Sequence, residues 1–579
     1  MMSRSRRNAL FILIGSLAVG GAILGAGVQG RLALPDVVAD VLPGAAPVTV
    51  TLASSVTKAR WLQAAVAAFG AADIRTAAGH PIRIELSNVL SGESMLGIAE
   101  GTLQPTVWSP GEGAWVDQLT ERWDRTHTRP VASQDCAPTV LTPVGLAMWR
   151  PMAEALGWPA DPISWAELVD LANDPDGWAR HGHPEWGRLR LGHTHPQYSS
   201  AGLLFLASVI YATLGRTDGV TEQDVYSPGV TEAMGILAQN TAKYGMVTTD
   251  LLNNMARGGP AFLHVASAFE EGTVRFNVER GDELRWPLAF VFPQDGTFWS
   301  DHPYCILDGA GWVGPEQAEA AELFRDFLLS PAMQAEAGAH FIRPLDPAAP
   351  LGPLLTTVNG TDPAAGPQTV PAFAIPSPEV SEAIIDQFLT TKRKATVLLV
   401  LDISGSMEGS AIRSATEATV GFLARLDPRD RVGLLVFDEE IRLSEAIGPV
   451  SGIVEQAQDR VQSLVAGGGT NLHGAICRAT ELLAAEQAQD AAASDSRLYG
   501  IVLLSDGSDT TGEISEGRML ATCLGAAEGE EPPRMFIISY GSGADAALLD
   551  RLATETRGAV FAADPASIGQ AYLRISAEQ

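Results

Sequence analysis

The chain has few cysteines and few basic residues for its length of 579. Four cysteines occur and none form a C-x-x-C pair, which argues against a zinc knuckle or a thioredoxin-like redox motif. Lys and Arg together number 39 against 68 Asp and Glu, so nucleic acid and anionic membrane surfaces would be repelled. Neither a phosphate-cradling P-loop nor the nucleophile-elbow pentapeptide of hydrolases is present. We therefore expect a binding protein rather than an enzyme.

Only one long uncharged apolar run is present, at residues 9–28, directly after Arg4, Arg6 and Arg7. Such a run can cross a hydrocarbon core of about 30 Å, and its basic flank favours a cytoplasmic N-terminus. We predict a single-pass signal anchor at residues 1–30, a linker at 31–47 and an extracytoplasmic bulk at the cell membrane. The alternative is a cleaved signal peptide and a secreted protein, since small residues occur near positions 25–27.

The four cysteines are compatible with an extracytoplasmic compartment, where disulfides form. Two lie in each half of the chain, so Cys136 and Cys305 are a candidate bridge. Free buried thiols are the alternative, which we favour for Cys477 and Cys523 because both fall on predicted helices.

Three separated segments in the C-terminal part carry oxygen-bearing side chains in a suggestive order. Asp402-Ile-Ser-Gly-Ser406 follows an apolar run, Thr470 follows three glycines, and Asp506 follows a second apolar run. Carboxylates and hydroxyls are hard ligands that suit Mg²⁺, with Mn²⁺ or Ca²⁺ as alternatives. A lone segment of this kind would be read as a helix cap. Three segments in this order favour a metal site.

The surrounding pattern predicts an α/β fold of the doubly wound kind. Short runs rich in Val, Ile and Leu, typical of strands buried on both faces, alternate with helical stretches. The predicted strands are residues 395–401, 431–437, 499–504 and 534–540, with 441–447 as an antiparallel edge strand. Ligands of such sheets bind beyond the carboxyl ends of the strands, where the acidic and hydroxyl residues fall.

Residues 395–579 thus resemble a von Willebrand factor type A domain, and the five oxygen ligands fill its metal-ion-dependent adhesion site. The resemblance implies that Asp402 and Asp506 set the charge of the site and that Ser404 and Ser406 coordinate through their hydroxyls. It also implies that Thr470 enters or leaves the coordination shell when a protein partner supplies an acidic side chain to the metal.

Residues 48–345 alternate short strands and helices in a different style. Strands are predicted at 48–53 and 82–86 and helices at 58–69 and 91–100. Polar turns follow the strands, and residues 142–149 read as a strand crossing between lobes. In the order of these segments the unit resembles the two-lobed, type II bacterial extracellular solute-binding proteins, which implies a small-molecule solute held in a cleft.

Cleft ligands are held by loops at strand ends and by helix N-termini, so hydroxyls and aromatic rings at such places are the solute-binding candidates. For each serine alone, helix capping is the competing interpretation, and for each aromatic ring it is core packing. The candidates are Ser54, Ser55, Ser91, Ser94, Trp108, Ser109, Tyr198, Ser199, Ser200 and Trp299, with Trp115 as a further member of the aromatic wall.

Two other readings of this unit are weaker. His193 and His195, with Asp301 and His302, could bind a transition metal, but we favour rigid polar turns near the hinge. Ser55-Val-Thr-Lys58 matches the S-x-x-K of penicillin-binding proteins, a match that is common by chance and that lacks the accompanying motifs.

Residues 346–394 form a connector whose many prolines disfavour helices and strands as far as residue 378, before a short amphipathic helix at 379–391. We predict an extended connector or a strap over the first unit. Two functions are compatible with this organisation. The first is a membrane-anchored binding protein that captures a solute and binds a protein ligand through Mg²⁺. The alternative is the solute receptor of an ABC-type importer with an accessory type A domain.

Overall fold

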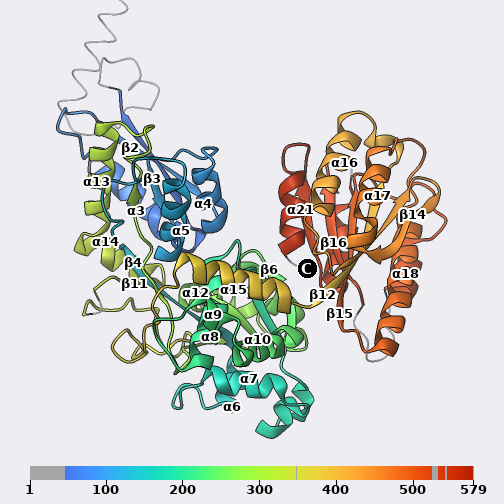
Figure 1. Cartoon of the computed structure of the whole chain (residues 1–579), viewed down its shortest axis with the longest axis horizontal. Helices are drawn as coiled ribbons and strands as arrows, with labels where there is room; N and C mark the ends of the chain where they lie inside the picture. Colours follow the sequence, from blue (N-terminus) through green and yellow to red (C-terminus); the bar gives the residue numbers. More distant parts are fainter. Residues whose placement is uncertain (1–45, 347, 525–531, 542–543, 578–579) are drawn as a thin grey trace, which may run out of the picture.

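The protein comprises three α/β bodies, each built on its own sheet (Figure 1). The structure, a computed structural model, describes residues 46–346, 348–524, 532–541 and 544–577. The predicted anchor at 1–30 and nearly all of the linker at 31–47 lie outside these residues. Within the described ranges, no helix is both long and apolar enough to span a bilayer.

The first lobe is a four-stranded sheet with strand order β10-β3-β1-β2. Its strands are β1 (Val48–Ser54), β2 (Ile82–Asn88), β3 (Val107–Ser109) and β10 (Cys305–Ile306). Its helices are α3 (Ala59–Ala71), α4 (Ser91–Ala99), α5 (Gly113–Asp124), α13 (Pro315–Leu328) and α14 (Pro331–Ala339). Val50 and Leu52 of β1 are fully buried against Trp61 of α3, so the alternation of buried residues along β1 anchors this lobe.

The second lobe is a larger sheet with the path β11-β4-β7-β5-β6, and β8 and β9 also pair with β4. Its strands are β4 (Val140–Trp149), β5 (Leu191–Thr194), β6 (Thr241–Gly245), β7 (Val265–Phe269), β8 (Leu288–Val291), β9 (Trp299–Ser300) and β11 (Arg343–Pro344). Its helices are α6 (Arg150–Ala155), α7 (Trp165–Asn173), α8 (Ser200–Leu214), α9 (Glu222–Val225), α10 (Pro228–Asn240), α11 (Thr248–Gly258) and α12 (Glu270–Arg280). Helix α8 is buried over most of its length, so it forms the centre of the lobe.

The lobes are joined by chain crossings at one side of the cleft. Val140, at the start of β4, packs in the core of the first lobe, whereas Leu146 belongs to the core of the second. The disulfide between Cys136 and Cys305 ties the segment before β4 to β10 at this crossing. The predicted bridge is therefore confirmed.

The third body is a six-stranded sheet with strand order β14-β13-β12-β15-β16-β17. Its strands are β12 (Lys394–Asp402), β13 (Arg431–Phe437), β14 (Ile441–Pro449), β15 (Arg497–Ser505), β16 (Arg534–Tyr540) and β17 (Ala559–Ala563). Its helices are α16 (Ser410–Leu423), α17 (Val450–Gln462), α18 (Leu472–Ala493), α19 (Glu516–Cys523), α20 (Ala546–Glu555) and α21 (Ile568–Ala577). All strands are parallel except β14, which is the predicted antiparallel edge.

The sequence interpretation missed α17, β17 and α21, and it was wrong about the second pair of cysteines. Cys477 on α18 and Cys523 at the end of α19 form a disulfide, because these two helices pack side by side. With Cys136 and Cys305 also bonded, no cysteine of the chain is free.

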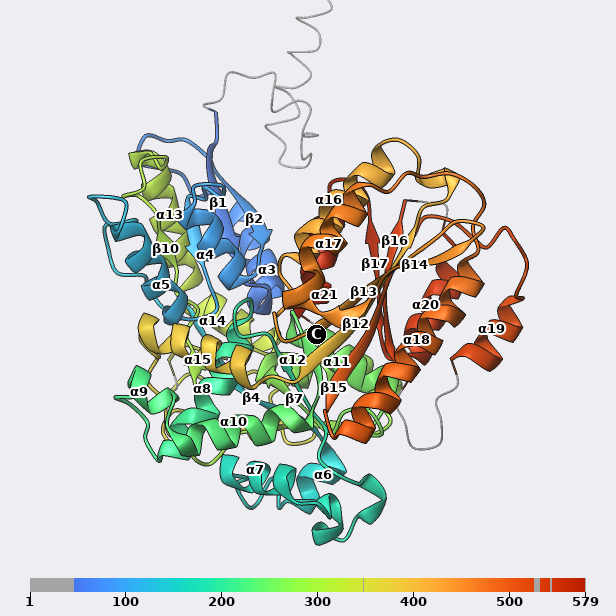
Figure 2. The same ribbon diagram turned by 45° about the vertical axis from the view of Figure 1, so that its right-hand side comes forward.

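The proline-rich connector is a strap laid along the second lobe. Its backbone bonds to the lobe at several points: Phe290 N donates to Gly360 O at 2.6 Å, and Thr297 N donates to Pro371 O at 2.9 Å. The strap leads into α15 (Pro378–Thr391), which runs along the lobes before the chain enters β12 (Figure 2). Phe388 of this helix is buried among lobe residues. The strap and α15 therefore belong structurally to the lobes.

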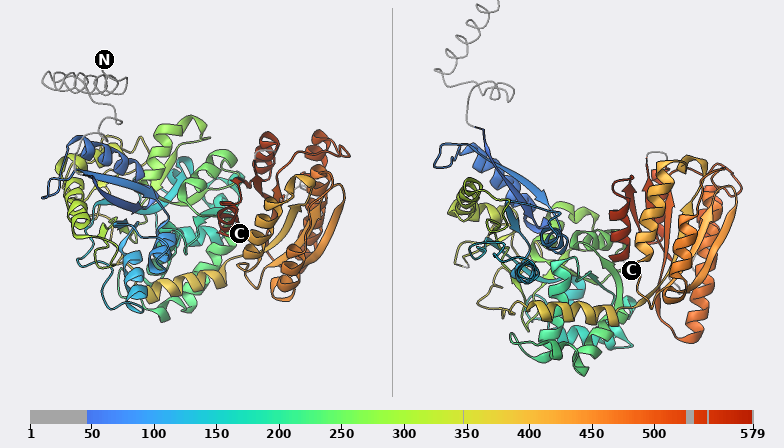
Figure 3. Two further views of the ribbon diagram at one scale, coloured as in Figure 1. Left: turned by 90° about the horizontal axis from the view of Figure 1, so that it is seen from above. Right: turned by 45° about the horizontal axis from the view of Figure 1, so that its top comes forward.

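The type A body docks beside the second lobe (Figure 3). Lys243 of β6 lies 4.9 Å from the ring centre of Phe536, and Phe262 is flanked by Arg534 at 5.6 Å and Arg557 at 5.4 Å. Cation–aromatic contacts of this kind contribute most where water is excluded, and Lys243 is 1% exposed. The two bodies therefore share a defined interface.

Candidate metal site and solute cleft

Asp402 is the last residue of β12 and is 1% exposed. Its carboxylate is fixed by two donors: Ser404 N donates to Oδ1 at 2.9 Å, and Ser505 Oγ donates to Oδ2 at 2.6 Å. Because β12 and β15 are paired in parallel, their carboxyl ends meet at one edge of the sheet. Asp402 therefore lies beside the segment that carries Asp506.

The two serines of the motif connect these carboxylates. Ser404 Oγ lies 3.1 Å from Ser406 Oγ, and Ser406 Oγ donates to Asp506 Oδ1 at 2.7 Å. Ser404 is buried, whereas Ser406 is exposed at the rim. Asp402, Ser404, Ser406 and Asp506 thus form one continuous polar cluster that opens to solvent.

Thr470 joins this cluster from the loop before α18. Its backbone is held by Thr510: Thr470 N donates to Thr510 Oγ1, and Thr510 N donates to Thr470 O, both at 2.8 Å. A Cβ placed on Gly507 would lie 3.7 Å from Ser406 Oγ and 3.8 Å from Thr470 Oγ1. Both hydroxyls therefore face the same side of Gly507, and the structure brings all five predicted residues together.

The electrostatics of this cluster fit a cation. Burial raises the pKa of Asp402, and the negative charge of Asp506 raises it further, against hydrogen bonds that lower it. A cation beside the two carboxylates would offset both effects. Two carboxylates and three hydroxyls form an all-oxygen donor set of the kind that Mg²⁺ takes. Over the described ranges, no cluster of three or more His, Cys, Asp or Glu side chains is placed to hold a metal.

The histidines considered as a transition-metal site lie in two separate places. His193 stacks on Phe205 with ring centres 5.0 Å apart, and burial lowers its pKa to about 4. His302 is instead bonded to Thr142 Oγ1 at 2.6 Å and faces Lys58 at 3.3 Å. His302 also has a φ of 48°, as found in turns. The expected rigid turn at residues 192–196 is therefore wrong for His193, which lies on β5 (Leu191–Thr194), and the absence of a transition-metal site here stays a prediction.

Half of the predicted solute-binding residues line one small hollow between the lobes. It has a volume of about 30 Å³, and Thr248 and Phe269 of the second lobe also border it. The predicted residues that line it are Ser55, Ser91, Tyr198, Ser199 and Ser200. A larger hollow of about 440 Å³ adjoins it between α4 and Met246, and it is lined by Ser94 and Tyr198. The cleft is therefore narrow at its closed end, where hydroxyl groups and apolar side chains both line it, and wider outside.

The remaining candidates have internal roles. Ser54 Oγ donates to Ser55 O at 3.2 Å, and Ser109 Oγ donates to Pro303 O at 2.7 Å. Trp108 is fully buried in the core, and its indole nitrogen donates to Ser94 Oγ at 2.9 Å. Trp299 stacks on Phe292. For Ser54, Ser109 and Trp108, packing and local hydrogen bonds give a sufficient account, whereas the buried Nε1 of Trp299 has no hydrogen-bond partner among the described residues.

The lobes are in direct contact across the hollow. Trp115 of α5 donates from Nε1 to Ser200 Oγ of α8 at 2.9 Å, and Ser200 Oγ lies 3.4 Å from Ser91 Oγ. A Cβ on Gly92 would lie 2.5 Å from Gln197 O, so a side chain at position 92 would force the lobes apart. The structure therefore shows a closed arrangement of the two lobes.

Sequence reasoning missed Glu112 and underrated Lys58, both of which are buried behind the cleft. Lys58 Nζ donates to Ser55 Oγ and Ser109 O at 2.9 Å and to Pro110 O at 3.2 Å, and burial lowers its pKa to about 7. Three acceptors match the three N–H donors of an ammonium group, so Lys58 positions Ser55 at the cleft wall.

Glu112, at the N-terminal end of α5, is 0% exposed. Neither of its carboxylate oxygens makes a hydrogen bond of good geometry. Burial raises its pKa to about 8, more than the nearby Ser200 hydroxyl, Trp115 and Lys58 lower it. The carboxyl is therefore protonated near neutral pH. A Gly-Glu-Gly turn between a strand and a helix was the only sequence signal, and it reads equally as a surface loop.

Fold and sites together define a two-lobed binding protein joined to a type A domain. Residues 50–343 match the family described as bacterial extracellular solute-binding protein, and residues 397–508 match the von Willebrand factor type A domain. The first match covers half of the chain, and the chain belongs to this family of solute-binding proteins. Proteins of this family bind without catalysing a reaction, and type A domains are likewise typically non-catalytic.

Two curated relatives each match less than a third of the chain. Inter-alpha-trypsin inhibitor heavy chain H4 of Sus scrofa is 30% identical over 162 residues, which is 28% of this chain and 17% of the relative. The human heavy chain H4 is 32% identical over 172 residues, covering 29% of this chain and 18% of the relative. The chain thus spans less than a fifth of the length of these relatives.

Solved structures of low sequence identity also match stretches of the chain. The sulfate-binding protein SubI from Mycobacterium tuberculosis H37Rv is 17% identical with a TM-score of 0.36, covering 52% of this chain and 88% of SubI. Iron-bound HitA from Pseudomonas aeruginosa is 15% identical with a TM-score of 0.40, and the match covers 60% of this chain and 99% of HitA. A von Willebrand factor type A protein from Catenulispora acidiphila is 19% identical with a TM-score of 0.28, and the match covers 32% of this chain and 42% of that protein.

Proposed function

We propose that the protein is a membrane-anchored extracytoplasmic binding protein with two sites. The lobes capture a small polar solute, and the type A domain binds a protein ligand through Mg²⁺. The observation that carries the second part is the contact chain from Ser404 through Ser406 to Asp506, with distances of 3.1 and 2.7 Å. Oxygen ligands from three separate segments meet there at the solvent-facing edge of a sheet.

In this proposal the ion is held by the five residues of the cluster. Asp402 and Asp506 supply the negative charge, and the hydroxyls of Ser404 and Ser406 bind directly. Thr470 enters or leaves as the partner binds. Because Ser406 is exposed, a carboxylate of a protein partner can reach the ion from solvent. The bound ion supplies the positive charge that attracts this carboxylate.

Metal titration tests the assignment. We expect the full chain to bind one Mn²⁺, counted by electron paramagnetic resonance, and Asp402→Ala to weaken this binding more than tenfold. Asp459→Ala removes an exposed carboxylate on α17 and serves as the matched control, which should bind as the wild type does. Equal Mn²⁺ affinity in Asp402→Ala and the wild type would contradict the metal site.

The solute proposal is supported by the family membership and by the hydroxyl groups of Ser55, Ser91 and Ser200, which line the hollow between the lobes. Native mass spectrometry of protein purified without added ligand should reveal a retained small molecule. Ser91→Ala combined with Ser200→Ala should reduce its occupancy, whereas Ser463→Ala on the type A domain should not. An unchanged occupancy in the double variant would place the solute elsewhere.

Membership of the solute-binding family also supports the alternative, a receptor of an ABC-type importer with an accessory type A domain. Deleting residues 395–579 distinguishes the two functions. Solute uptake that survives the deletion favours the importer, whereas loss of adhesion to, or assembly with, a protein partner favours the binding protein with two sites.

The membrane anchor is tested by fractionation. The full chain should stay in the membrane pellet after alkaline extraction, and a chain starting at residue 31 should be released. Release of the full chain as well would favour a cleaved signal.

A further inference from the structure

Three helix N-termini meet at the small hollow between the lobes. Helices α4, α8 and α11 begin at Ser91, Ser200 and Thr248, and all three residues line the hollow. Among the described residues, the residue that precedes each of these helices provides no side-chain cap. The first N–H groups of a helix have no partner within the helix, and they carry a positive partial charge. This side of the hollow therefore suits an anionic group.

A buried acidic group lies at the wall of the same hollow. Glu112 directly precedes α5 and is fully buried, but its side chain does not cap that helix. Its carboxyl lies beside the Ser200 hydroxyl and the Trp115 indole, which are bonded to each other with Trp115 Nε1 donating to Ser200 Oγ at 2.9 Å. Ser200 and Gly111 both line the hollow, so the carboxyl is within reach of a molecule bound there.

The surrounding side chains leave both oxygens of this carboxyl able to accept hydrogen bonds. Neither oxygen has a partner of good geometry among the described residues. Lys58 is a nearby cation, but its three N–H groups are directed at one hydroxyl and two carbonyl oxygens. Asp301, the other charged neighbour, is itself an acid. A buried carboxyl is stabilised by hydrogen-bond donors, and a bound molecule that carries N–H groups can supply them.

We propose that the solute captured by the lobes is a small zwitterion, whose anionic group binds at the N-termini of α4, α8 and α11 and whose ammonium group binds Glu112. The inference rests on the proposed solute capture and adds the class of the solute. A simple anion would suit the helix N-termini but would offer no donor to Glu112, and a simple ammonium ion would face three positive helix ends. A molecule that carries both groups suits both sides.

The dimensions of the cleft fit such a molecule. The hollow has a volume of about 30 Å³ while the lobes are in contact, so the two kinds of group lie close together. The adjoining hollow of about 440 Å³ gives room for the rest of a longer solute. Ser200 touches both halves of the site, because it begins α8 and also contacts the wall that carries Glu112.

Binding of a zwitterion should release a proton. Burial raises the pKa of Glu112 to about 8, so this carboxyl holds a proton at pH 7 in the free protein. An ammonium group beside it favours the carboxylate, and the proton passes to solvent as the solute binds. A plain anion would favour the protonated carboxyl instead. The direction of proton exchange therefore distinguishes the two classes of solute.

Calorimetric titration of the full chain with glycine, γ-aminobutyrate and taurine at pH 7 tests the proposal. We expect at least one of these zwitterions to bind at one site per chain, and acetate and methylammonium to bind at least tenfold more weakly. Repeating the titration in buffers of different ionisation enthalpy measures the protons exchanged. We expect about one proton to be released for each zwitterion bound.

Glu112→Gln keeps the shape of the side chain but cannot ionise, so it should weaken binding of the same zwitterion at least tenfold and remove the proton release. Lys58 and Asp301, the other titrating groups beside Glu112, are unchanged in this variant. Glu154→Gln, at an exposed position on α6, is the matched control and should bind as the wild type does. Tryptophan fluorescence reports whether each variant is folded.

Absence of binding by all three zwitterions, undiminished binding to Glu112→Gln, or proton uptake in place of release would each overturn the proposal. These outcomes differ from a failure of solute capture itself. A molecule without an ammonium group, retained in native mass spectrometry, would uphold capture and reject the zwitterion.

Discussion

Replacing Glu112 by Gln should make the solute-binding unit more stable, increasingly so as the pH rises from 5 to 7. The Glu112 carboxyl is fully buried, and its pKa is raised from 4.5 to about 8. Between these two values the unfolded chain releases this proton while the folded protein keeps it. Stability is therefore lost progressively as the pH rises toward 8, and it is fully retained only below 4.5.

The size of the effect follows from the shift. Each pKa unit corresponds to about 1.4 kcal/mol, so raising the pH from 5 to 7 should cost the wild type on the order of 3 kcal/mol of unfolding free energy through this group alone. Gln has a similar shape and cannot ionise, so the variant lacks this slope. Lys58 has the opposite effect, because burial lowers its pKa from 10.5 to about 7. Above pH 7 the folded protein loses this proton before the unfolded chain does, so stability rises with pH there and is unaffected between pH 5 and 7.

Tryptophan fluorescence during urea unfolding measures this difference for the correct part of the chain. All 12 tryptophans fall between residues 61 and 312, so the signal reports the solute-binding unit and not the type A domain. Glu154→Gln, at an exposed position on α6, is the charge-matched control. Other titrating groups, including Asp301 and His302, are present in both proteins and cancel in the comparison. A stability difference between Glu112→Gln and the wild type that stays constant from pH 5 to 7 would refute the reasoning.

Three further changes test the packing. Arg343→Met leaves the buried Glu270 carboxylate without the guanidinium that contacts it at 2.6 and 2.7 Å. The unfolding free energy of the solute-binding unit, measured in urea, should therefore fall by about 3–5 kcal/mol. Adding Glu270→Met to this variant should restore much of that free energy. Trp115→Phe removes the hydrogen bond to Ser200 between the lobes, which is worth about 1 kcal/mol. The lobes should then open more often, and the radius of gyration of the protein in small-angle scattering should increase. An unchanged radius would mean that this bond does not hold the lobes closed. Cys477→Ser combined with Cys523→Ser opens a loop of 46 residues and should lower the unfolding free energy of the type A domain by about 4 kcal/mol. Calorimetry should show this loss as a lower unfolding temperature. An unaltered transition would show that removing the disulfide adds little conformational entropy to the unfolded chain.

The strands and the convergence of the five oxygen-bearing side chains were predictable because both depend on local sequence. Residues 395–401 are apolar throughout, as a strand buried on both faces must be, and the acidic turn follows at once. Parallel strands place their carboxyl ends at one edge, so Asp402 and Asp506 meet without further information. By contrast, β17 (Ala559–Ala563) is short and mostly half-exposed, and its sequence carries little strand signal.

The buried charges and the cysteine pairing could not be predicted in this way. Glu112 lies in a turn that looks solvated, and it is buried only because the lobes close over it. Cys477 and Cys523 lie on different helices, and their proximity depends on how α18 and α19 pack. In both cases the deciding contacts join residues far apart in the chain, which periodicity and turn chemistry do not encode.

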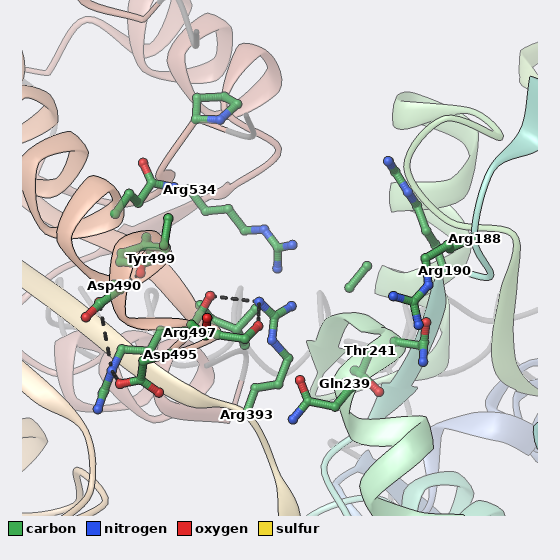
Figure 4. A pocket seen from close by; sticks show the side chains of 18 of the residues that line it. Arg188, Arg190, Gln239, Thr241, Arg393, Asp490, Asp495, Arg497, Tyr499 and Arg534 are labelled. Atoms are coloured by element: carbon green, nitrogen blue, oxygen red, sulfur yellow. Dashed lines mark hydrogen bonds and ion pairs between the residues drawn. The ribbon is translucent and has the colours of Figure 1, made fainter. Parts of the chain in front are cut away.

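The two ends of the type A sheet face different surroundings. Asp402 ends β12 and Asp506 follows β15, whereas Arg497 begins β15 and Arg534 begins β16. A nine-residue strand is about 30 Å long, so the five candidate metal ligands and the end with Arg497 and Arg534 are roughly a strand length apart. The second lobe borders the end with Arg497 and Arg534 (Figure 4), whereas Ser406 at the other end is exposed to solvent. The proposed protein partner can therefore engage an ion there without displacing the lobe, and any influence of that partner on solute capture must pass through the sheet and its helices rather than through direct competition for space.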